Sequence, residues 1–273
     1  MLITRLPSPD EAPMMDTQKA ELLGLSLDAV TLETVAVRCL EFCRGPRMSH
    51  TIVTVNASHL CMMRDDRELA LACRAASLTL ADGMSVVWAL RASGQSAPER
   101  VAGVDLMARL LAAAAKHGLR VYFLGAKREV VTALVEKSRI QYRGIKIAGF
   151  RDGYFGRDDH QHIVEEIRSS RADILFVGMP SPFKETWCER HRLRLAVPVI
   201  MGVGGSFDVL AGYIRRAPGW VQAMGLEWFW RLLMEPRKLW KRYLTTNTEF
   251  IWLAAQEIVA RRLGRRAAGD ERA

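Results

Sequence analysis

The chain has 273 residues, of which 49% are hydrophobic, and its formal net charge is +9 at pH 7. This length and composition allow a sizeable buried core, which excludes disordered and collagen-like proteins. The excess of basic residues predicts an acidic partner, which can be nucleic acid, anionic lipid or a phosphorylated substrate.

Residues 1–20 predict a flexible leader, because they carry three prolines and no sustained apolar period. The five cysteines form no C-x-x-C pair and follow no signal-peptide pattern, so we expect reduced thiols and a cytoplasmic protein. The chain has no run of 18 uncharged apolar residues, and we therefore expect no transmembrane helix.

One pattern recurs between residues 50 and 210: a short apolar strand runs into a glycine-rich or polar turn, usually followed by a helix. Helices are predicted at 104–117, closed by Gly118, and at 159–170. The alternation predicts an α/β fold with a mostly parallel sheet covered by helices on both faces. The strand segments are HTIVTVNASHL, LTLADGMSVV, LRVYFLGAKREVV, IKIAGFRDGYF, ADILFVGMPSP and VPVIMGVGGSFDVL.

Asp82 stands between a short predicted strand, Leu78–Leu80, and a helical pattern from Met84 to Leu90. It would then lie at the carboxyl end of a strand, where open α/β sheets bind their ligands. Asp82 and Gly83 can simply form a turn. The functional alternative is a general base, with Thr54, Asn56 and Arg100 as polar neighbours from other loops.

Two glycine-rich turns are candidate phosphate sites. The segment GVGGSFD, 202–208, follows an apolar strand and opens a predicted helix, so its backbone N–H groups could bind phosphate. It has neither the G-K-[ST] ending of a Walker loop nor the G-x-G-x-x-G spacing of dinucleotide binders, and a tight structural turn is the alternative. LGAK, 124–127, is similar, with Lys127 as a possible phosphate contact. Lys184 and Glu185 follow another strand end, where a solvated first helical turn explains Glu185 equally well.

Residues 213–273 form a basic, tryptophan-rich segment, which we call the C-terminal appendage. It contains five of the seven tryptophans, twelve Lys and Arg and six Asp and Glu, and helices broken at Pro218 and Pro236 are predicted. Such a segment can bind single-stranded nucleic acid, lie in a membrane interface or pack as an ordinary helix pair. Because no nucleic-acid module precedes it, we favour the membrane surface and expect no nucleic-acid partner.

The motifs TVNASH, LADGMSVVWALR, ERVAGVDLM, VIMGVGGSFDVLAG, RRAPGW and GLEWFWRLLMEPRKLWKRY, in this order, resemble the WecG/TagA/CpsF family of bacterial glycosyltransferases. The resemblance runs from about Leu22 to about Trp252. It implies a Rossmann-like domain at 21–212 with a helical C-terminal appendage. It also implies inverting, metal-independent transfer of a sugar from a UDP-sugar to a polyprenyl-diphosphate-linked acceptor.

The resemblance also implies residue roles. Asp82 matches the family's proposed catalytic base, and Thr54, Asn56 and Arg100 match polar residues of the same pocket. We assign UDP-sugar binding to the strand-end loops, at Gly83, Gly125, Lys127, Lys184, Glu185, Gly202, Gly204 and Gly205. Contact with the acceptor diphosphate and the membrane is implied for Arg231, Arg237, Lys238, Lys241 and Arg242.

Two departures from the family pattern concern substrate contacts. Lys184 stands where the family often has Gln, and Lys238 where Arg is common, so a bidentate phosphate contact is lost at that position. No D-x-D motif occurs in the chain, and we expect no metal and no cofactor.

We therefore expect a hexosyltransferase of bacterial surface-polysaccharide assembly, bound to the inner face of the cell membrane. The donor carries N-acetylmannosamine or a related hexose, and UDP-glucose or UDP-glucuronate transfer in exopolysaccharide assembly is the alternative. A nicotinamide-dependent oxidoreductase is a rival that lacks its glycine fingerprint. A non-catalytic membrane- or nucleic-acid-binding module is a second rival, and a homo-oligomer is left open.

Overall fold

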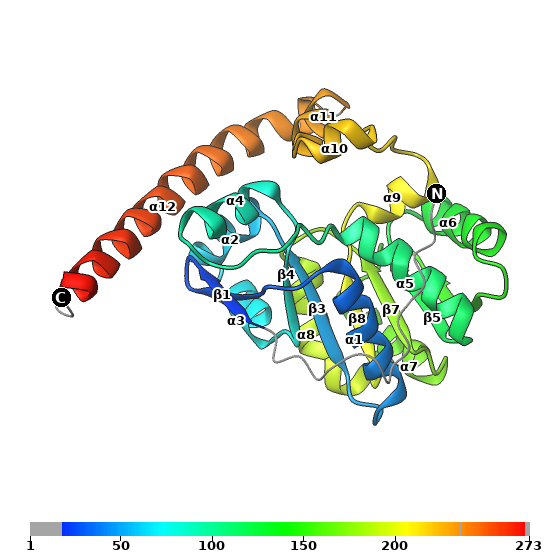
Figure 1. Ribbon diagram of the computed structural model, residues 1–273. Coiled ribbons are helices and arrows are strands. Elements are labelled where there is room, and N and C mark those ends of the chain that lie inside the picture. Colours follow the sequence, from blue (N-terminus) through cyan, green and yellow to red (C-terminus); the bar gives the residue numbers. More distant parts are fainter. Residues whose placement is uncertain (1–17, 235, 271–273) are drawn as a thin grey trace.

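The computed structural model describes residues 18–234 and 236–270, and its centre is a six-stranded sheet (Figure 1). The strand order is β4-β3-β8-β7-β5-β6, and every neighbouring pair is parallel. The predicted parallel sheet is therefore confirmed. Its strands are β3 (His50–Val55), β4 (Leu78–Ala81), β5 (Arg120–Gly125), β6 (Lys146–Arg151), β7 (Ile174–Gly178) and β8 (Val199–Gly202).

The central strands are apolar along their whole length because helices cover both sides of them. All five residues of β7 are buried, with the sequence ILFVG, which is the pattern of a parallel strand between two helical layers. The hydrophobic core accordingly lies on both faces of the sheet. Residues such as Phe123 and Phe176 fill one face, whereas Tyr122 and Leu175 fill the other.

One helical layer packs on the face that contains Phe123, and another layer packs on the opposite face (Figure 1). The first layer consists of α1 (Leu32–Arg44), α5 (Gly103–His117), α6 (Arg128–Gln141) and α9 (Ser206–Ala211). The predicted C-cap Gly118 has φ +67°, the left-handed conformation that glycine adopts without strain. The second layer consists of α2 (Ala57–Asp65), α3 (Arg67–Ala75), α4 (Met84–Ala92), α7 (His160–Ser169) after the 3-10 turn η2 (Arg157–Asp159), and α8 (Phe183–Leu195).

A β-hairpin precedes the sheet, formed by β1 (Lys19–Leu22) and β2 (Leu25–Asp28). Its first strand begins inside the predicted leader, and the Lys19 ammonium pairs with the buried Asp28 carboxylate at 2.6 Å. Lys19 and Ala20, the last two residues of the predicted leader, therefore belong to a strand, and residues 1–17 lie outside the described part.

The C-terminal appendage is helical, as predicted. It contains α10 (Gly219–Ala223), α11 (Glu227–Met234) and α12 (Pro236–Asp270), so helices do begin after Pro218 and at Pro236. α12 lies across α2 and α4, and its Phe250 and Ala254 are buried in the core that those helices share (Figure 1). The appendage is therefore packed onto the α/β unit. None of the described helices is long and apolar enough to cross a membrane.

Candidate functional site

The predicted site residues of the α/β unit lie in or follow strands that end at one edge of the sheet, which we call the carboxyl edge. All six strands run in the same direction, so their carboxyl ends meet there. Neighbouring strands β3 and β8 lead into α2 and α9, which lie on opposite faces of the sheet. Ligands of open α/β sheets bind at such a point.

Asp82 directly follows β4, as predicted, and two backbone contacts fix it. Its N–H donates to the Val55 carbonyl at 2.9 Å, and its Oδ2 accepts from the Gly103 N–H at 3.2 Å. A Cβ placed on Gly103 would lie 3.4 Å from Asp82 Oδ2 and 3.3 Å from Thr54 Oγ1. The Thr54 hydroxyl and the Asp82 carboxylate therefore lie beside the same glycine.

Asn56 also lies near this place, but a hydrogen bond within its own helix occupies its side chain. It caps α2, and its Oδ1 accepts from the His59 N–H at 3.3 Å. A Cβ on Gly83 would be 3.5 Å from the Asn56 Cβ, which places the two loops against each other. Asn56 is thus brought next to the Asp82 loop by the β3–β4 pairing.

The Arg100 side chain is turned toward the C-terminal appendage. Its Nη1 lies 2.8 Å from Glu227 Oε2, although the backbone next to Arg100 is tied to β4 by a Val101 N–H bond to Ala81. In this conformation the guanidinium pairs with Glu227. Sequence reasoning missed this partner because it lies 127 positions away.

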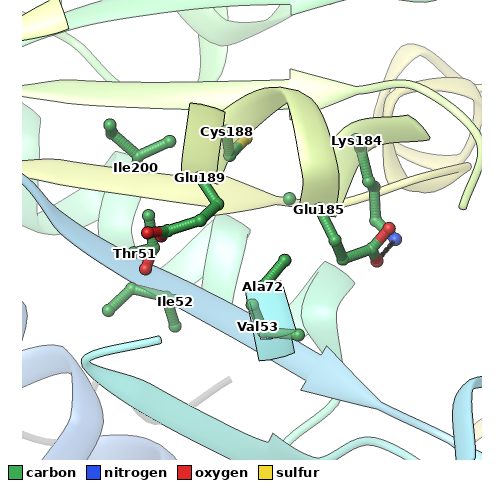
Figure 2. A pocket seen from close by; sticks show the side chains of 10 residues that line it. Thr51, Ile52, Val53, Ala72, Lys184, Glu185, Cys188, Glu189 and Ile200 are labelled. Atoms are coloured by element: carbon green, nitrogen blue, oxygen red, sulfur yellow. Dashed lines mark hydrogen bonds and ion pairs between the residues drawn. The ribbon is translucent and has the colours of Figure 1, made fainter. Parts of the chain in front are cut away.

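A buried polar cluster, formed by His59, Ser181, Lys184 and Glu185, covers the carboxyl end of β8 (Figure 2 shows the last two). His59 Nε2 is 2.9 Å from Ser181 Oγ and 3.0 Å from Glu185 Oε1, while the Lys184 ammonium binds both Ser181 and Glu185. A Cβ on Gly202 would be 3.2 Å from the Lys184 stem. Lys184 is therefore part of an internal ion pair.

The cluster holds Glu185 in its charged form. Burial raises the pKa of Glu185, but the His59 hydrogen bond and the Lys184 charge outweigh it and leave the pKa well below its usual range. His59 and Ser181 were not predicted as site residues. The sequence carried one signal for His59. It lies three positions after Asn56, which is the spacing of a capping box.

A small cavity of about 10 Å³ lies beside this cluster, between β3, β8, α3 and α8 (Figure 2). Its volume is that of about one water molecule, and Thr51, Glu185 and Glu189 line it with oxygen atoms that have no hydrogen-bond partner among the described residues. It is too small for a sugar nucleotide. Its full lining is Thr51, Ile52, Val53, Ala72, Lys184, Glu185, Cys188, Glu189, Ile200 and Gly202.

The glycine turns lie at the carboxyl edge, as predicted. At Gly125 the structure explains why the residue is glycine. Gly125 has φ +132°, and a Cβ there would be 2.4 Å from the Gly178 carbonyl oxygen, so only glycine fits. Lys127 precedes α6 and is exposed. Gly204 has φ +50° with open space around it, and Gly205 is the N-cap of the six-residue α9.

The predicted contacts with the acceptor diphosphate cannot be placed. Arg231 belongs to α11, and Arg237, Lys238, Lys241 and Arg242 belong to α12, but their side chains lie outside the described part of the structure. Within the part that is described, no group of His, Cys, Asp and Glu side chains could hold a metal ion.

A model of the glycosyl transferase WecG/TagA/CpsF family matches residues 20–264, which is most of the chain and includes the carboxyl edge, α10, α11 and most of α12.

Proposed function

The chain belongs to the WecG/TagA/CpsF family of glycosyl transferases, and on that premise we propose that it transfers a hexosyl group from a UDP-sugar to a polyprenyl-diphosphate-linked saccharide. The chain is thus a glycosyltransferase of a family that serves cell-surface polysaccharide biosynthesis. The observation that carries the finer proposal is the position of Asp82. Its carboxylate lies at the carboxyl edge, oriented by the Gly103 amide and beside the Thr54 hydroxyl.

We propose that Asp82 acts as a general base. An inverting transfer needs a carboxylate that removes the proton from the acceptor hydroxyl while the new C–O bond forms and the bond from the sugar to UDP breaks. Such proton transfer contributes about 10²–10⁴-fold to a rate. We assign the Thr54 hydroxyl, which lies beside the same glycine as this carboxylate, to hydrogen-bonding a sugar or acceptor oxygen.

The departing UDP carries negative charge, which fixed donors must stabilise. We propose that the loops at Gly83, Gly125 and Gly202–Gly205 bind the nucleotide with their backbone amides, assisted by Lys127 and Arg100. Arg100 would keep its Nη1 on Glu227 and offer its other guanidinium nitrogens to the diphosphate. Lys184 and Glu185 neutralise each other, and we assign them to shaping the floor of this site.

The surface of the C-terminal appendage supports a location at the membrane. Its helices expose large apolar side chains, and in the sequence these alternate with the basic residues assigned to the acceptor diphosphate. Tryptophan and basic residues together are typical of a helix lying in the headgroup region. The exposed side chains are Trp220, Met224, Trp228, Phe229, Leu233, Met234 and Trp240.

A donor panel tests the reaction class. The purified chain is incubated with a polyprenyl-diphosphate-linked acceptor and one UDP-sugar at a time, with EDTA present, and UDP release is followed. UDP-N-acetylmannosamine is the first donor, and UDP-glucose and UDP-glucuronate test the alternative. Turnover with one of them supports the proposal, whereas absence of both turnover and UDP binding would overturn it.

A further inference from the structure

The Gly103 amide, which orients Asp82, lies in a short segment, residues 100–105, that leads from the loop after α4 into the first turn of α5. Val101 at its start is bonded to the last residue of β4, and Asp105 lies in the first turn of α5. The Gly103 N–H donates to Asp82 Oδ2 from the middle of this segment. Any movement of residues 100–105 therefore changes the environment of the Asp82 carboxylate.

The C-terminal appendage holds this segment at both ends. Glu227 Oε2 lies 2.8 Å from Arg100 Nη1, and Arg216 Nη2 lies 2.6 Å from Asp105 Oδ2. The Arg216 contact is bidentate, because its Nη1 binds Asp105 Oδ1 as well. Glu227 Oε1 also accepts from Arg216 Nε at 3.3 Å, so the four side chains form one continuous network.

This network differs from ordinary surface ion pairs in its burial and geometry. The Arg100 and Glu227 side chains are 15% and 23% exposed, and those of the bidentate pair Arg216 and Asp105 are 26% and 35% exposed. Bidentate, partly buried pairs between arginine and carboxylate fix orientation better than single exposed pairs, which contribute little. The pKa of Arg216 is correspondingly raised, since its bonds to Asp105 and Glu227 outweigh the effect of burial.

We propose that Arg216 and Glu227 are positioning residues, through which the C-terminal appendage holds the Gly103 amide against the Asp82 carboxylate. The proposal rests on the proposed role of Asp82 as the base. It assigns the appendage a contribution to the chemical step through the segment 100–105, separate from any contact with lipid or acceptor.

The test uses the full chain with Arg216→Gln and Glu227→Gln, each a neutral replacement, and Arg216→Lys, which keeps the charge but loses the bidentate contact. Arg64→Gln is the matched control. It removes another ion pair between the α/β unit and the appendage, Arg64 to Glu249 at 3.1 Å, which has no link to the segment 100–105. Melting temperatures show which variants are folded.

We expect kcat to fall about tenfold or more in Arg216→Gln and Glu227→Gln, because small displacements of a catalytic group are costly. The KM for the UDP-sugar should stay within about twofold, because no nucleotide contact is removed. Arg216→Lys should be intermediate and Arg64→Gln unchanged. A kcat equal to that of the unmodified chain, or an equal loss in Arg64→Gln, would overturn the proposal.

Amide hydrogen exchange of a peptide that spans residues 100–106 separates this inference from the proposed function. The network predicts faster exchange in Arg216→Gln and no change in Arg64→Gln. Should the unmodified chain transfer no sugar, the proposed function fails, while the exchange measurement still decides whether the appendage holds the segment. Unchanged exchange in Arg216→Gln would contradict the network itself.

Discussion

Thr54 and Asp82 come from neighbouring strands and lie beside the same glycine. Thr54 pairs with Leu80 in the β3–β4 register, and a Cβ on Gly103 would be within 3.4 Å of both the Thr54 hydroxyl and the Asp82 carboxylate. The absence of a side chain at Gly103 therefore leaves room for these two groups, and the backbone N–H of Gly103 donates to Asp82 Oδ2.

Gly103→Ala tests this arrangement. The added Cβ would lie 3.3 Å from the Thr54 hydroxyl, which must shift by a few tenths of an ångström beside Asp82, so we expect kcat to fall about tenfold. The free energy of unfolding should change little. The preference for alanine over glycine within a helix, up to about 1 kcal/mol, offsets the cost of the closer contact. Gly219→Ala is the control, because a Cβ there meets no atom within 4 Å and Gly219 is also the first residue of a helix. Equal activity of the two variants would contradict the arrangement.

Glu185→Gln tests the buried cluster through stability. It leaves Lys184 buried without its charge partner, and we expect the free energy of unfolding at pH 7 to fall by about 3–5 kcal/mol. The double variant Lys184→Gln/Glu185→Gln should recover part of this loss, because no unpaired charge is left inside. Urea denaturation of the two variants measures the difference. If the double variant is less stable than Glu185→Gln, the loss in Glu185→Gln does not come from an unpaired Lys184 charge.

The same cluster predicts a pH dependence. The pKa of Glu185 is lower in the folded chain than its usual value of 4.5, so its contribution to stability is fully present above about pH 4.5. It is lost as the pH falls from there toward the lower pKa of the folded state. The slope of unfolding free energy against pH below 4.5 should therefore be smaller in Glu185→Gln than in the unmodified chain. Identical slopes would show that the carboxylate has no lowered pKa.

Leu233→Gln tests the membrane role of the appendage. Leu233 in α11 is 60% exposed, and loss of its burial in the headgroup region should weaken binding to anionic vesicles by about tenfold. Leu193→Gln is the matched control, since Leu193 is 79% exposed at the end of α8 that lies away from the carboxyl edge. Cosedimentation with vesicles compares them. Equal weakening of vesicle binding in both variants would show that α11 has no special role in membrane binding.

The sequence predicted the strands, their parallel arrangement and the position of Asp82, because apolar strands followed by glycine or polar turns leave a clear local pattern. It could not predict which loops meet, since the strand order depends on packing between distant segments. Thr54 and Asp82 were expected in one pocket from the resemblance, and the parallel pairing of β3 with β4 brings both beside Gly103. Arg100 pairs with Glu227 far along the chain, and no local pattern marks that contact.

For the C-terminal appendage too, the sequence predicted local features but not the contacts with distant segments. Its prolines and tryptophans predicted broken helices with a separate surface, and the breaks at Pro218 and Pro236 are confirmed. The packing of Phe250 into the core of α2 and α4 was not predicted, because the apolar residues of α12 do not follow one helical face over its length.

Asp82→Asn tests the central claim most directly, with turnover and UDP affinity measured on the same preparation. The variant keeps the shape of the side chain and removes the negative charge that accepts a proton. We predict that kcat falls by about 10²–10⁴-fold while the Kd for UDP, measured by calorimetry, stays within about twofold. Turnover within a few-fold of the unmodified chain would contradict the assignment of Asp82 as the base.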